Sequence, residues 1–241
     1  MKLCMFTPIE LDLERGWPGK LDGDRVIQVA AQTLQAFFTG GGMAREHAVY
    51  PLAEVRFLVP VLRPPAIRIF EGSDFHFGNP TSLYGPDEDV PVPVEQIEAV
   101  LRPAAVIGVI EQIGGFTVMN DWHAPELEGA KAYDFATSLG PVVVTPDEFD
   151  GGEGEMVARV NGEERSRGNL RDLNWPWERL LEQAARNTHL VAGDVIGSGT
   201  VGTGCILELG DGRWLRPGDE VELEVEGLGV LRNRIAPPIE G

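Results

Sequence analysis

The stretch that decides the fold runs from Asp121 to Ile235 and contains Ala136-Thr-Ser-Leu-Gly-Pro141 and Gly193-Asp-Val-Ile-Gly-Ser-Gly-Thr200. Short apolar runs follow one another here, separated by glycine and proline, which is typical of short strands joined by tight turns. Glycine lets the backbone approach a ligand or another strand closely. The stretch therefore predicts strands around a closely packed loop.

Strand patterns recur along the rest of this stretch. The run Glu155 to Arg167, with Asn161-Gly162 at its centre, predicts a hairpin, because Asn-Gly favours the type I′ turn. A second hairpin is expected between Leu207 and Leu215. Glu220 to Glu226 alternates strictly, so its apolar residues face inward and its glutamates form a solvated strand face. Further strands are expected at Ala104–Gly108 and Gly115–Asp121.

One segment has clear helical spacing. Trp177, Leu180, Leu181, Ala184 and Ala185 lie on one face of a helix that begins near Pro176. Strands outnumber helices too heavily for a doubly wound sheet. We therefore predict a strand-dominated α+β fold.

The chain before this stretch predicts a smaller unit. Arg25–Val29 reads as a strand, and Gln32–Phe38 as a short helix ended by Gly40-Gly-Gly42. Arg63-Pro-Pro65 interrupts regular structure. We place a boundary there, between a small N-terminal β-rich unit, residues 1–63, and a C-terminal domain, residues 64–241.

Composition narrows the class of partner. The 241 residues are 43% hydrophobic and carry a net charge of −18, which repels nucleic acid and anionic membranes. Two cysteines give no disulfide framework, and no run is long enough to span a bilayer. We expect a cytoplasmic protein that binds neither nucleic acid nor membrane.

A glycine motif points to a nucleotide only superficially. Gly197-Ser-Gly-Thr-Val-Gly202 matches G-x-G-x-x-G, but a dinucleotide site needs a helix directly after the loop. Cys205-Ile-Leu-Glu-Leu209 follows instead and reads as a strand. We therefore predict no nucleotide cofactor, which disfavours a nucleotide-dependent oxidoreductase as the function.

Several phrases together resemble the fumarylacetoacetate hydrolase superfamily, in the family's order over roughly residues 66 to 235. They are Phe77-Gly-Asn-Pro80, Ala105-Val-Ile-Gly108, Gly115-Phe-Thr-Val-Met-Asn-Asp-Trp122, Asp134-Phe-Ala-Thr-Ser-Leu-Gly-Pro141, Gly193 to Thr200, Trp214-Leu-Arg-Pro-Gly-Asp219 and Gly227-Leu-Gly-Val-Leu-Arg-Asn233. The resemblance implies a mixed β-sandwich roll with a small N-terminal unit, usually a homodimer.

The resemblance also implies a chemistry. Members bind Mg²⁺ or Mn²⁺ through carboxylates, and the cation chelates a small oxo acid and stabilises the developing enolate. Hydrolysis of carbon–carbon bonds, decarboxylation, tautomerisation and hydration all occur in the family. The expected ligand here is a small carboxylic or oxo acid.

Carried over residue by residue, the family's metal site is reduced. Asp121 matches the carboxylate of the Asn-Asp-Trp phrase, but the Glu-x-Glu pair falls on Val100 and Arg102. The stretch that holds a further metal residue and the catalytic histidine is deleted. A single carboxylate does not hold Mg²⁺ against water. The alternative is a site rebuilt from Asp121 with His123 and Glu126 or Glu128.

The remaining pocket residues are carried over in the same way. The substrate-facing arginine becomes Pro125, and the family's lysine becomes Tyr133, with Lys131 two residues earlier on the same side of an extended chain. Pocket-lining positions match Thr200 and Glu208. We expect Glu208 and Lys131 to be catalytic and the substrate to be bound by the following residues: Thr200, Asn120, Gly199 and Phe77.

Two functional hypotheses remain open. The first is a divergent enzyme with hydrolase, decarboxylase, isomerase or hydratase chemistry on a small oxo or enol acid; without a metal, the last three are easier than hydrolysis of a carbon–carbon bond. The second is a non-catalytic relative that binds a small molecule or an assembly partner, because metal ligands, arginine and lysine have been lost together.

Overall fold

The computed structural model describes residues 1–109, 111–201 and 212–238, whose strands form a twelve-stranded and a five-stranded sheet. The large sheet runs in the order β4-β3-β2-β1-β12-β11-β10-β15-β6-β7, with β5 beside β1 and β8 beside β12. Its strands are β1 Lys2–Pro8, β2 Trp17–Asp22, β3 Arg25–Val29, β4 Glu46–Pro51, β5 Val55–Leu58, β6 Ile67–Glu71, β7 Asp74–Gly78, β8 Leu83–Tyr84, β10 Leu101–Ile107, β11 Ile113–Asp121, β12 Thr137–Val144 and β15 Val195–Gly197.

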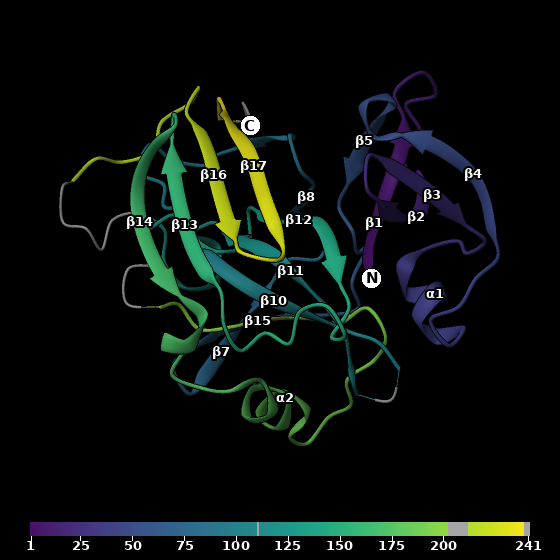
Figure 1. The fold of residues 1–241 in the computed structure, drawn as a ribbon. Helices are drawn as coiled ribbons and strands as arrows, with labels where there is room; N and C mark the ends of the chain where they lie inside the picture. Colours follow the sequence, from purple (N-terminus) through teal and green to yellow (C-terminus); the bar gives the residue numbers. More distant parts are fainter. Residues whose placement is uncertain (110, 202–211, 239–241) are drawn as a thin grey trace.

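The small sheet covers the middle of the large one. Its order is β14 (Glu163–Asn169), β13 (Glu155–Val160), β16 (Glu220–Val225), β17 (Gly229–Ala236) and β9 (Asp89–Pro91). In Figure 1 it lies in front of β10 and β11. The helices are α1 Leu34–Thr39 and α2 Trp177–Ala185, with short 3₁₀ turns at Leu52–Glu54, Gly129–Ala132 and Leu170–Asp172.

The central strands are buried on both faces. Leu101, Ala105 and Ile107 of β10 join the core cluster shared with the small sheet. Ala104 and Val106, between them in sequence, join a second cluster on the opposite face, with residues of β1, α1 and β6. This period of two is what a pleated strand imposes. The fold is the strand-dominated sandwich that the sequence predicts.

Most predicted elements are confirmed. Asn161 and Gly162 both have positive φ, 53° and 77°, in the turn between β13 and β14, as a type I′ turn requires. The helix after Pro176 runs from Trp177 to Ala185, and the alternating strand buries Val221, Leu223 and Val225. The hairpin expected at Leu207–Leu215 falls largely outside the described residues.

The N-terminal unit is continuous with the rest through the large sheet. β1 pairs with β12, with Leu3 opposite Val143, and the second core cluster holds side chains from both sides of residue 63. Figure 1 shows β1 to β5 and α1 grouped at one end of the molecule. The boundary at residue 63 itself stays a prediction.

The buried side chain of Phe116 should contribute strongly to the stability of the fold. Phe116, 2% exposed, packs edge-on to Phe149 and against Trp177, with ring centroids 5.5 and 5.0 Å away. Phe116→Ala should lower the free energy of unfolding by about 3–5 kcal/mol, because it leaves a cavity between the sheets and α2. Urea unfolding measures this loss.

Phe77→Ala is the matched control, since the Phe77 side chain is 62% exposed. It should cost less than about 1 kcal/mol. Equal losses for the two substitutions would contradict the packing described.

Candidate functional site

A cavity of about 320 Å³ opens at the ends of β10 and β11. Its polar lining comes from Glu71, Glu98, Arg102, His123, Tyr133, Asn174 and Thr200. Its apolar lining comes from Val100, Leu173, Trp175 and Leu180, with Gly72 and Gly199 completing the wall. A volume of this size suits a small ligand.

Strand alternation aims the central side chains at this cavity. Glu98, Val100 and Arg102 are two residues apart, so they share one face of the chain that becomes β10. Glu98 lies opposite His123 in an antiparallel bridge, and the Asp121 N–H donates to the Val100 carbonyl. The ladder between β10 and β11 therefore brings Arg102, Asp121, Glu98 and His123 to one face of the sheet.

Arg102 is the centre of the polar network. Its side chain is 2% exposed, and Nη1 donates to the carbonyl oxygens of Phe70 and Ser198, each 2.9 Å away. Nε and Nη2 lie 3.2 and 3.1 Å from Oδ2 of Asp121. Nη2 also lies 3.5 Å from Oε1 of Glu71. Each nitrogen of the guanidinium therefore has at least one partner.

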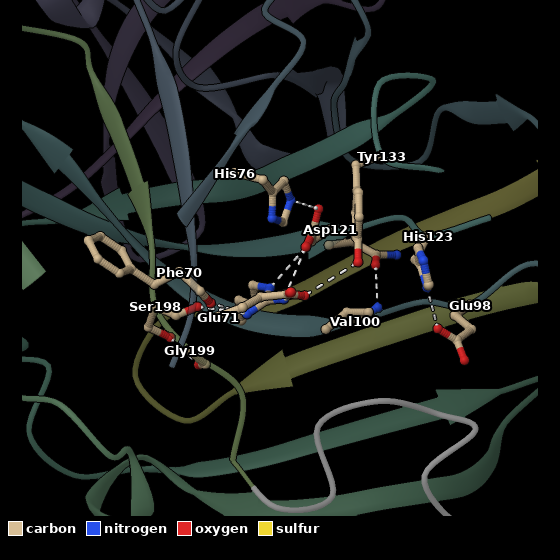
Figure 2. A network of polar contacts seen from close by, with 12 residues as sticks. Phe70, Glu71, His76, Glu98, Val100, Asp121, His123, Tyr133, Ser198 and Gly199 are labelled. Atoms are coloured by element: carbon tan, nitrogen blue, oxygen red, sulfur yellow. Dashed lines mark hydrogen bonds and ion pairs between the residues drawn. The ribbon is translucent and has the colours of Figure 1, made fainter. Parts of the chain in front are cut away.

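Asp121 lies behind Arg102 and has no exposed surface. Its Oδ1 is 3.4 Å from Nε2 of His76, while Oδ2 is held by Arg102. Figure 2 shows His76 and Asp121 facing each other beside Glu71 and Tyr133. Arg102 thus separates the Asp121 carboxylate from the cavity.

A second arrangement joins the two histidines. Tyr133 is sandwiched between His76 and His123, with ring centroids 4.1 and 4.5 Å away. On the far side, Nδ1 of His123 lies 2.6 Å from Oε2 of Glu98 (Figure 2). The Glu98 carboxylate fixes the orientation of the His123 ring, which lines the cavity.

The phenol of Tyr133 is held in its neutral form. Burial, then the nearby carboxylates of Glu71, Asp121 and Glu98, raise the pKa of Tyr133 from 10.0 to about 12, against an opposing effect of Arg102. Its hydroxyl donates to Glu71 over 3.5 Å. Tyr133 therefore acts as a donor and a ring surface, not as an anion, at neutral pH.

The described residues do not fit a divalent cation at Asp121. Of the family's carboxylate positions, two hold Val100 and Arg102, and the guanidinium occupies Oδ2 of Asp121. Within residues 1–109, 111–201 and 212–238 no three histidine, cysteine or acidic side chains are grouped to hold a metal. The described residues do not group Asp121 and His123 with Glu126 or Glu128 either: His123 contacts Glu98, and Glu126 accepts from the backbone N–H of Gln96.

The glycine loop is divided between packing and the cavity. A Cβ at Gly197 would lie 2.7 Å from Sδ of Met119, so this glycine lets β15 approach β11. Gly199 and Thr200, expected to bind substrate, do line the cavity. Asn120 does not, because its side-chain oxygen accepts from the N–H of Val100.

Three other expected residues lie elsewhere or are not described. Lys131 is in a 3₁₀ turn rather than an extended segment, so its 77% exposed side chain points away and pairs with Asp134. Phe77 lies outside on β7, with its ring near the guanidinium of Arg68. Glu208 falls outside the described residues.

Sequence reasoning missed the residues that dominate the site. The sequence pattern presents Val100 and Arg102 only as lost metal ligands, although a spacing of two from Glu98 to Arg102 puts all three residues on one strand face. His76 reaches Asp121 from β7, across the sheet order, and no local pattern marks that approach.

Comparison with known proteins identifies relatives. The sequence profile of the fumarylacetoacetate (FAA) hydrolase C-terminal domain matches residues 52–236. Human mitochondrial oxaloacetate tautomerase FAHD2A is 28% identical over 88% of this chain and 77% of its own length.

Across the described part of the chain no helix has the length and hydrophobicity to cross a bilayer.

Solved structures show the same fold. The fumarylacetoacetate hydrolase of Exiguobacterium antarcticum superposes with a TM-score of 0.84 at 23% identity, over 98% of this chain and 99% of that one. Maleylpyruvate hydrolase of Sphingobium, solved with manganese(II) and pyruvate, gives 0.81 at 21% identity, over 99% and 100%.

Removing the counter-ion of Arg102 tests the buried pair. Asp121→Asn should lower the free energy of unfolding by about 3–5 kcal/mol, because it leaves a buried guanidinium without its carboxylate. Asp12→Asn, which breaks the exposed pair with Arg56, is the control and should cost at most about 1 kcal/mol. Denaturant unfolding of both variants decides, and similar losses would contradict the account.

Alkaline titration tests the environment of Tyr133. The difference in phenolate absorbance between the wild type and Tyr133→Phe should appear near pH 12. Since the unfolded chain releases this proton first, the tyrosine's contribution to stability falls as the pH rises from 10.0 toward about 12. A difference centred near pH 10, as for a free phenol, would show that Tyr133 is not buried beside these carboxylates.

Proposed function

Because the chain belongs to the fumarylacetoacetate hydrolase family, we propose that it is an enzyme that moves a proton on a small oxo or enol acid. The reaction is a keto–enol tautomerisation or a related isomerisation in the cavity beside Arg102. The observation that carries the proposal is the contact of 2.6 Å between Nδ1 of His123 and the Glu98 carboxylate at the cavity wall.

A histidine oriented by a carboxylate is suited to general acid–base catalysis. Glu98 and His123 are mostly but not fully buried, with side chains 15% and 22% exposed, so a ligand reaches them from the cavity. Tyr133, stacked on the His123 ring, limits its rotation. The ring therefore presents one nitrogen in a fixed direction.

Tautomerisation needs only what these residues supply. In ketonisation the enol oxygen loses its proton and the other carbon of the enol double bond gains one, so the atoms balance without water or a second substrate. His123 accepts the first proton and returns one to carbon. Thr200, at the same wall, is placed to donate to an oxygen of the acid.

The relatives support the substrate class. The human relative is an oxaloacetate tautomerase by name, and the cavity volume suits an acid of that size. Oxaloacetate is therefore the first substrate to test. The cytoplasmic location and the homodimer stay predictions.

A non-catalytic binder is the second candidate. It is favoured by one observation, which is that Val100 and Arg102 stand at positions where the family carries metal carboxylates. A binder of this kind would hold the same acid without turnover.

Histidine substitution tests the enzyme. His123→Gln should lower kcat for ketonisation of enol-oxaloacetate by about 10²–10⁴-fold, because the proton acceptor is lost. Glu98→Gln should lower kcat less, since the ring stays but loses its orientation. The rate is measured as the decay of enol absorbance after subtraction of the spontaneous reaction.

His189→Gln is the matched control, because the His189 side chain is 93% exposed and does not line the cavity. It should leave kcat unchanged. A wild-type rate equal to the spontaneous one, together with a rise in melting temperature on adding oxaloacetate, would favour the binder instead.

A further inference from the structure

We propose that the guanidinium of Arg102 takes the place of the divalent cation, so that the positive charge facing the ligand's oxyanion is part of the chain. This inference rests on the proposed function only for the identity of the ligand, a small carboxylate or enolate. Its geometric basis is independent of turnover.

Arg102 stands at a position where the family carries a metal ligand. Val100 and Arg102 fall where the family has its Glu-x-Glu pair, and both side chains line the cavity in front of Asp121. Glutamates at these two positions, with Asp121, would surround one point with carboxylates. In this chain the same space holds an apolar side chain and a cation.

The guanidinium of Arg102 is held rigidly. Two backbone carbonyls and Oδ2 of Asp121 fix Nη1, Nε and one side of Nη2, as described above. They come from β6, β11 and the residue after β15, so three elements must move before the guanidinium does. A donor fixed in this way stabilises developing negative charge without reorganisation.

One partner of Arg102, the Glu71 carboxylate, is exchangeable. Glu71 is 55% exposed and lies 3.5 Å from Nη2, a long contact at the edge of the cavity. An incoming carboxylate or enolate oxygen can replace the Glu71 oxygen on Nη2 while the contacts to Asp121, Phe70 and Ser198 remain. The ligand therefore meets a charge-assisted donor that is already in place.

Arg102 excludes a divalent cation from Asp121. A divalent cation at Asp121 would stand against the guanidinium and compete for Oδ2, and Mg²⁺ surrenders its water only to several oxygen ligands. The carboxylates of Glu71 and Glu98 lie at the cavity wall and are engaged by Arg102, Tyr133 and His123.

Metal titration tests the exclusion. Chelator-treated wild type should show no saturable uptake of Mn²⁺ in calorimetry and no rise in melting temperature. Val100→Glu with Arg102→Glu should gain one saturable Mn²⁺ site and a higher melting temperature when loaded. Val100→Glu alone, which keeps Arg102, is the matched control and should gain none.

Two outcomes would overturn the exclusion. One is saturable Mn²⁺ binding by the wild type that Asp121→Asn removes. The other is a folded double variant that takes up no Mn²⁺. A double variant that folds only with Mn²⁺ present supports the inference, and if it never folds the wild-type titration decides alone.

Pyruvate binding tests the positive role. Chelator-treated wild type should bind pyruvate. Arg102→Gln should raise the dissociation constant at least about tenfold, because one charge-assisted hydrogen bond is lost. Arg25→Gln, which breaks only an exposed pair with Asp22, should not change it. Binding that needs Mn²⁺, or an Arg102→Gln variant with wild-type affinity, would overturn the inference. An inactive protein that still gives the expected results would sink the proposed function and leave this inference standing.

Discussion

The buried ion pair between Arg102 and Asp121 is the constraint on which the site depends. Neither charge is stable alone in that position, because an unpaired charge in a low-dielectric interior is strongly unfavourable. Together they require β10 and β11 to keep their register, and the remaining donors of Arg102 require the ends of β6 and β15 to close around it. The wall of the cavity is a consequence of satisfying one guanidinium.

A built-in cation changes what the family fold can do. A guanidinium carries one charge in fixed directions, whereas a divalent metal offers two charges and open coordination positions. The proposed proton transfer needs a stabilised enolate and an acid–base group, and Arg102 and the Glu98–His123 pair, the residues proposed for these roles, line one cavity.

Local pattern was enough to predict much of the fold. The alternation in β16 and the Asn161-Gly162 turn are decided by neighbours in sequence, and both are as predicted. The site was less predictable because its contacts join residues 71, 76, 102, 121 and 198, which only the sheet order brings together. Lys131 shows the same limit, since an extended chain would aim it inward and the 3₁₀ turn does not.

A crystal structure of the chelator-treated protein with oxalate, a planar mimic of an enolate acid, tests the central claim most directly. The account predicts an oxalate oxygen about 3 Å from Nη2 of Arg102, with Glu71 displaced and the contacts to Asp121 intact. Oxalate bound through a metal ion on Asp121, with Arg102 turned out of the site, would contradict it.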